Sequence, residues 1–145
     1  MNPFTNETRV RAKFQFHDVV TVSPSLIENA IHDTHTELLR YLDPDVDTDP
    51  LPDALVMGET LLAGAQVLRS LAYADAVSQR RLTIGANRIE AGDRFRALLA
   101  AASLAEKSGW YVLEPYLTAV PPRQVSAVTN SHDIWGHRAY GDQTQ

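Results

Sequence analysis

The chain of 145 residues contains no cysteine. Disulfide bonds, thiol catalysis and cysteine-ligated zinc are therefore excluded. The chain also lacks a long unbroken apolar run. Its most apolar stretch, residues 54–77, is interrupted by Glu59, Arg69 and Asp75, which argues against a membrane span. Residues 1–13 contain no apolar segment of the kind that a secretory signal needs, so we expect no signal peptide.

Basic residues are too few for a strong nucleic-acid site. The formal net charge is −5, and residues 23–57 hold eight acidic residues and one basic residue, a net charge of −7. Proteins that grip the phosphate backbone need a basic surface. We therefore expect no tight, direct binding of nucleic acid. An acidic surface along which DNA passes without being bound is still compatible with this charge.

Motifs that carry catalysis are also missing. The sequence contains no G-x-S-x-G nucleophile turn, no G-x-x-x-x-G-K-[ST] phosphate loop and no G-x-G-x-x-G dinucleotide fingerprint. The sequence thus predicts a protein that is not an enzyme and that needs no cofactor.

Three segments have the spacing of amphipathic helices, and with 44% hydrophobic residues they can build one core. The first follows the Ser23-Pro24 start signal and runs to about Leu42. The second, from about residue 53 to residue 78, is apolar on most sides, which predicts a central helix that also touches another subunit. The third covers about residues 91–108, with Gly109 as the residue after its end.

The remaining segments are predicted to be extended. Residues 1–8 look like a polar arm, and residues 9–22 alternate apolar and polar side chains as in a strand. Residues 80–89 contain a turn signal and form a short β-like connector. The predicted fold class is therefore mainly α: a small helical bundle of three principal helices in residues 1–117, with an extended C-terminal docking arm in residues 118–145.

The acidic loop that follows the first helix, residues 43–52, could in principle bind a metal ion. Its aspartates alternate as in a calcium loop, but neither register supplies the glycine and the glutamate that an EF-hand needs at the sixth and twelfth positions. His32 and His35 lie three residues apart on one predicted helix face and would need a third ligand that the sequence does not identify. We therefore expect a solvated loop and an ordinary polar helix face.

Charges of opposite sign are separated along the chain. A solvated surface with some salt bridges is one interpretation, and a head-to-tail contact between neighbouring copies is a second. A third is contact of the basic residues with DNA. The candidate interface residues are Asp45, Asp47 and Asp49 on the acidic side, and Arg80, Arg81, Arg94 and Arg96 on the basic side.

The last 28 residues carry aromatic and apolar side chains without helical spacing. Such a tail either folds over its own domain or docks on a partner, and we favour docking because buried aromatic residues and arginine dominate interface energies. The candidate docking residues are Ile134, Trp135, Arg138 and Tyr140.

Several short strings occur in a known order. They are FQFHDV at residues 14–19, VSPSLI at residues 22–27, YL at residues 41–42, LTIG at residues 82–85 and GWYVLEPY at residues 109–116. Together with the helix layout over residues 10–117, this order resembles the head–tail adaptor (connector) proteins of long-tailed phages.

The resemblance implies a structural role in the virion neck. Such adaptors have a small helical core and form a ring, commonly twelve-fold, beneath the portal protein. A C-terminal arm grips the portal, the other face receives a stopper or tail-completion protein, and DNA passes through the lumen. Two other hypotheses stay open: a dimeric regulatory or scaffolding domain of cellular origin, and a metal-dependent enzyme that uses His32, His35 and the acidic loop.

Overall fold

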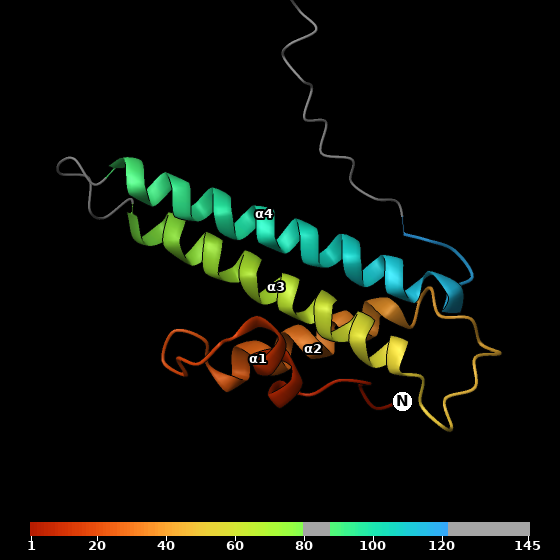
Figure 1. The fold of residues 1–145 in the computed structure, drawn as a ribbon. Coiled ribbons are helices and arrows are strands. Elements are labelled where there is room, and N and C mark those ends of the chain that lie inside the picture. The colour runs from red at the N-terminus through yellow and green to blue at the C-terminus, as the bar shows by residue number, and fades with distance from the viewer. Residues whose placement is uncertain (80–87, 122–145) are drawn as a thin grey trace, which may run out of the picture.

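The computed structural model describes residues 1–79 and 88–121, and these residues are mainly helical (Figure 1). The predicted fold class, a small helical bundle, is therefore confirmed. The elements in chain order are α1 (Glu7–Phe14), α2 (Pro24–Leu38), α3 (Asp53–Gln79), α4 (Arg88–Leu113) and the 3₁₀ turn η1 (Glu114–Tyr116).

The helices are arranged around α3. The 27 residues of α3 and the 26 residues of α4 form an antiparallel hairpin, and α1 and α2 pack on the other side of α3 (Figure 1). At 1.5 Å per residue the hairpin is about 40 Å long. Because α3 lies between two layers, it is buried on most sides, as its composition predicts. The helices that bury it belong to the same chain.

The start of α2 agrees with its sequence signal. The Ser23 side chain accepts a hydrogen bond from the Leu26 backbone N–H at 3.3 Å, and Pro24 occupies the first helical position. The helix ends at Leu38, four residues earlier than predicted. The carbonyl of Leu38 then accepts hydrogen bonds from the backbone N–H groups of both Tyr41 and Leu42, so the chain turns there.

The prediction of an extended N-terminal segment is wrong for residues 7–14, which form α1. Asn6 caps this helix by accepting from Arg9 N–H at 3.0 Å, and Gln15 ends it in the left-handed conformation. Val10 and Phe14 are four residues apart, a spacing that fits both an alternating strand and a helix face. The helical alternative prevails because both side chains pack on the same core.

The core has two neighbouring parts. One joins α1, α2 and the middle of α3, and its buried members are Val10, Val22, Ile27, Ala30, Ile31, Ala63 and Val67. The other lies where the N-terminus, the end of α2, the start of α3 and the end of α4 meet. Its members are Phe4, Leu38, Leu55, Leu62, Trp110 and Leu113. Phe4 shows that residues 1–8 are not a free polar arm.

The third predicted helix does not stop at Gly109 but continues to Leu113. Gly109 serves close packing, because a Cβ atom there would lie 2.9 Å from the side chain of Leu62 and 3.1 Å from the backbone oxygen of Gly58. Ala102 and Ala105 of this helix are buried, so this side of the helix packs inward.

The end of the described core is held beside the acidic loop. Asp43 N–H donates to the Tyr116 carbonyl at 3.0 Å, and Thr118 N–H donates to the Tyr41 carbonyl at 2.8 Å. The predicted β-like connector lies mostly outside the described residues, as does most of the predicted arm. Within residues 1–79 and 88–121, no helix is both long and apolar enough to span a bilayer.

Candidate functional site

The three aspartates predicted at a subunit interface, Asp45, Asp47 and Asp49, are all exposed on the loop between α2 and α3. Two carboxylates of this loop stabilise local turns. Asp43 Oδ1 accepts from Asp45 N–H, and Asp47 Oδ1 accepts from Asp49 N–H, each at 2.9 Å. These turns account for the alternating spacing. Among the described residues, no three His, Asp or Glu side chains are grouped to hold a metal ion.

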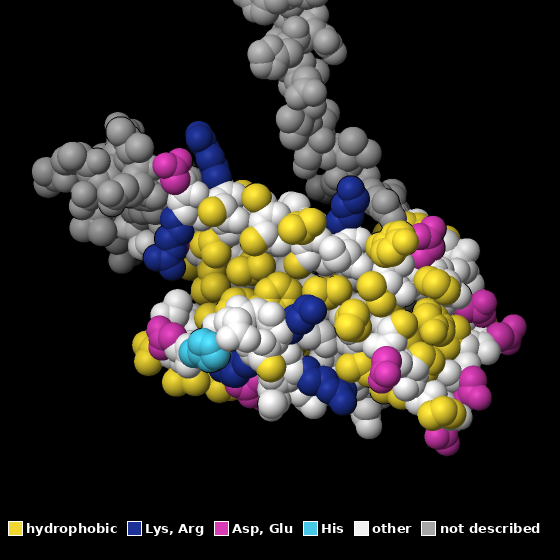
Figure 2. All heavy atoms as spheres, viewed as in Figure 1, with side chains coloured by type: hydrophobic (Ala, Val, Ile, Leu, Met, Phe, Trp, Pro, Cys, Tyr) yellow, Lys and Arg dark blue, Asp and Glu magenta, His cyan; other side chains and the backbone are white. Residues whose placement is uncertain are grey.

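The basic candidates that the structure describes are at the opposite end of the hairpin. Arg94 and Arg96 lie exposed near the start of α4, and Arg94 Nε pairs with Asp75 Oδ2 at 2.9 Å. Asp53 is the first residue of α3 and Asp75 lies in its last part, 22 residues further along the same helix, or roughly 33 Å away. Figure 2 shows acidic side chains gathered at the right end of the molecule, while basic side chains lie at the left end and in the middle, with some acidic ones beside them. Arg80, Arg81, Ile134, Trp135, Arg138 and Tyr140 lie outside the described residues.

The outer face of α4 is uncovered in the described structure. Within it α4 packs mainly on α3 and η1, so its other side meets no part of the bundle. Leu104 is 67% exposed and Tyr111 is 71% exposed, and Ala97 and Ala101 are exposed on the same face. These four positions follow the four-and-three spacing of a helix–helix seam. We call them the α4 outer face.

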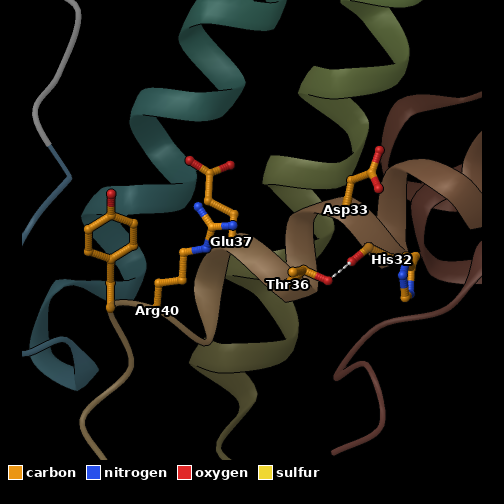
Figure 3. A pocket seen from close by; sticks show the side chains of 6 residues that line it. His32, Asp33, Thr36, Glu37 and Arg40 are labelled. Carbon is orange, nitrogen blue, oxygen red and sulfur yellow. Dashed lines mark hydrogen bonds between the residues drawn. The ribbon is translucent and has the colours of Figure 1, made fainter.

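A shallow polar hollow lies along α2. Figure 3 shows its side chains on one side of the helix, with Thr36 Oγ1 donating to the His32 carbonyl at 2.9 Å. The lining residues are His32, Asp33, Thr36, Glu37, Arg40 and Tyr41. His35 is not among them, because it is buried while His32 is exposed. The two histidines therefore do not face one site, which speaks against the hypothesis of a metal site built on both.

A buried polar cluster joins the N-terminal segment to α2 and α3. His35 Nδ1 lies 2.6 Å from Glu59 Oε1, and the Glu59 side chain is fully buried. Glu59 Oε2 accepts from Thr5 N–H at 2.7 Å, and His35 Nε2 lies 3.2 Å from the Met1 carbonyl. Thr60 Oγ1 donates its single hydrogen to the Val56 carbonyl, so the Thr5 hydroxyl donates to Thr60 Oγ1 at 2.6 Å.

Burial controls the acidity of Glu59. Loss of solvation raises the pKa of this carboxyl, while the hydrogen bonds from His35 and from Thr5 N–H act in the lowering direction without cancelling the effect. An acid whose pKa is raised on folding contributes stability below its ordinary pKa. That contribution is lost as the pH rises through the folded pKa.

Sequence reasoning did not find this cluster. We expected His35 on a polar helix face, and this expectation is wrong because the side chains of His35 and Glu59 satisfy each other inside the bundle. They are 24 residues apart and sit on different helices. One local signal could have indicated the cluster. Glu59 lies in a helix that is apolar on most sides, and a glutamate buried in such a helix needs a hydrogen-bond partner.

Comparison with known proteins finds no relative: no family model, no curated protein and no solved structure matches the chain. The likeness to phage adaptors therefore depends on the short sequence strings and their order.

Proposed function

We propose that the chain is a structural subunit of a phage neck. Copies of it form a ring, commonly twelve-fold in such adaptors, that joins the portal protein to a stopper or tail-completion protein. DNA passes through the lumen of this ring without sequence-specific contact. In this proposal the chain has no catalytic residue, no cofactor and no membrane contact.

The observation that carries the assembly part of the proposal is the α4 outer face. Helices of a globular protein usually bury their apolar faces, yet Leu104 and Tyr111 are exposed at helical spacing on α4. Tyrosine and leucine on one helix face provide apolar area that is favourable to bury against another copy. A neighbouring subunit is the occupant that the proposal predicts.

The distribution of charge supports a head-to-tail arrangement. A contact of this kind brings one end of a subunit near the other end of its neighbour. The acidic loop with Asp45, Asp47 and Asp49 and the basic start of α4 with Arg94 and Arg96 lie at opposite ends of the hairpin. Complementary charges at such a contact favour the correct register and speed association. Arg80 and Arg81 are assigned to the same contact by their place in the sequence.

The proposal that residues 118–145 are a docking arm is supported by the place where the chain leaves the core. Thr118 is hydrogen-bonded to Tyr41, so residues 118–145 start from a fixed point beside the acidic loop. We assign Ile134, Trp135, Arg138 and Tyr140 to the contact with the portal protein, because large aromatic residues and arginine are the usual anchors of an interface.

The test is assembly measured by native mass spectrometry and negative-stain microscopy, with the full chain alone and co-expressed with the portal protein of the same phage. We expect closed rings, with or without the portal. Leu104→Glu should abolish them, because it places a charge in the proposed seam. Val20→Glu is the matched control, since Val20 is 88% exposed on the loop between α1 and α2.

The outcomes separate the hypotheses. A dimer at every concentration, unchanged by the portal protein, would favour the cellular regulatory or scaffolding domain. Rings formed by Leu104→Glu as readily as by the wild type would remove the α4 outer face from the contact.

A further inference from the structure

Residues 1–5 form a strap over one end of the bundle, where α2 and α3 lie side by side (Figure 1). Phe4 is only 5% exposed and belongs to the core part that contains Leu38 and Trp110. Its carbonyl accepts from Arg9 Nη1 at 3.3 Å. Two further backbone groups of the strap contact the buried pair: Thr5 N–H donates to Glu59, and the Met1 carbonyl lies beside His35 Nε2. The Thr5 hydroxyl donates to Thr60 Oγ1.

The hydrogen-bond partners fix the number of protons on this pair. A carbonyl oxygen has no hydrogen to give, so the contact with the Met1 carbonyl requires a hydrogen on His35 Nε2. His35 Nδ1 and Glu59 Oε1 are 2.6 Å apart, so one further hydrogen lies between them. That hydrogen belongs either to a histidinium beside a carboxylate or to a carboxylic acid beside a neutral histidine. Both forms are neutral overall, and both keep every strap contact.

We propose that residues 1–5 are a conformational strap whose closed position is locked by the one proton shared between His35 and Glu59, so that removing it or adding a second opens the strap. This inference concerns the single subunit and does not depend on ring assembly.

Removing the shared proton breaks a contact in either tautomer of His35. With the hydrogen kept on Nε2, the lone pair of Nδ1 faces a carboxylate oxygen. With the hydrogen on Nδ1, the lone pair of Nε2 faces the Met1 carbonyl. Buried groups of this kind cannot use water instead, so the cost is that of unsatisfied polar atoms.

Adding a second proton creates a different conflict. A histidinium then faces a carboxylic acid, and the two carboxyl oxygens of that acid face two donors, His35 Nδ1 and Thr5 N–H. The hydrogen of the acid therefore has no acceptor among these contacts, so it is left unpaired or displaces one of the two donors. The strap is therefore most stable over a window of pH, within which the pair holds one shared proton.

Other charged groups near the strap do not supply this dependence. Arg9 of α1 donates to the Phe4 carbonyl and not to either side chain of the pair. α4 contributes the uncharged side chains Trp110 and Leu113 to the core part around Phe4. From the strap itself the nearest titratable group is the α-amino group of Met1, a residue that is 75% exposed. Burial raises the pKa of Glu59, which helps the pair to hold its proton.

The experiment uses the full chain with labelled threonine and valine methyl groups and ¹⁵N-labelled histidine, followed by NMR from about pH 5 to about pH 10. The Thr5 methyl signal reports the closed and open positions, and the ring nitrogens of His35 report its hydrogens. Where the open form has already lost the proton and the closed form still holds it, we expect the closed-to-open ratio to fall about tenfold per pH unit. Methyl signals of the core residue Val67 should not move in the same range.

Glu59→Gln is the decisive variant. A glutamine at this position accepts from Thr5 N–H through its oxygen and donates to His35 Nδ1 through its amide, so all contacts remain without a shared proton. We expect its strap to stay closed at alkaline pH. Thr60→Val is the control. It removes the hydrogen bond between the two threonine hydroxyls, which does not involve the shared proton, so it should weaken the closed position of the strap equally at every pH.

Three results would overturn the proposal. They are a wild-type ratio that is constant over the whole range, alkaline opening of Glu59→Gln at the wild-type pH, and movement of the Val67 signal together with that of Thr5. If Glu59→Gln does not fold, the wild-type ring signals decide instead. In the closed state His35 Nε2 must carry a hydrogen, and a closed state without one contradicts the lock.

Discussion

The packing of α1 on α3 leads to a sharp prediction at Gly64. A Cβ atom at this position would occupy the space of the Phe14 ring, which also stacks on Phe16 with 5.5 Å between ring centroids. Forcing a methyl group into a packed contact costs about 1–3 kcal/mol. Replacing glycine by alanine inside a helix contributes about 1 kcal/mol in the opposite direction. We therefore expect Gly64→Ala to lower the free energy of unfolding by up to about 2 kcal/mol.

The same substitution should have the opposite effect when Phe14 is shortened. In a Phe14→Ala background the ring is gone, so Gly64→Ala should raise the free energy of unfolding by about 1 kcal/mol. The double-mutant cycle then gives a coupling of about 1–3 kcal/mol between the two sites. Urea denaturation followed by circular dichroism measures all four proteins. A Gly64→Ala variant that is equally stabilised in both backgrounds would show that Phe14 does not lie over Gly64.

Two further predictions concern the arm and the first long helix. Deleting residues 122–145 leaves the Thr118–Tyr41 hydrogen bond in place, so the shortened chain should keep its helical circular dichroism and lose binding to the portal protein in a pull-down. Unchanged affinity would contradict the arm assignment. Ser23→Ala removes the cap of α2 and should lower the free energy of unfolding by about 1 kcal/mol in urea. Ser25→Ala is the matched control, and an equal loss there would mean that the cap contributes nothing.

Sequence reasoning succeeded where the signal is local. The Ser23-Pro24 start of α2 and the long apolar stretch of α3 define those helices within their own residues. It failed for α1, since an eight-residue helix with one buried residue has too few positions to distinguish two periodicities. It also ended α4 at Gly109, because the glycine signal for a helix end is the same as that for a close helix contact. The side chain of Leu62, which packs against Gly109 in the folded chain, shows that this glycine serves a close helix contact.

The two departures from ordinary helix patterning point to different roles. Glu59 and His35 place polar groups inside the bundle, where their mutual hydrogen bond and the strap satisfy them. Such a pair makes the core specific to one arrangement of the N-terminal segment. Leu104 and Tyr111 do the reverse, since they keep apolar surface outside although polar residues at those positions would leave the packing of α3 on α4 intact. Because Leu104 and Tyr111 lie at helical spacing on one face of α4, we expect a second copy to bind there. Substitutions at Leu104 should therefore change assembly far more than they change the free energy of unfolding.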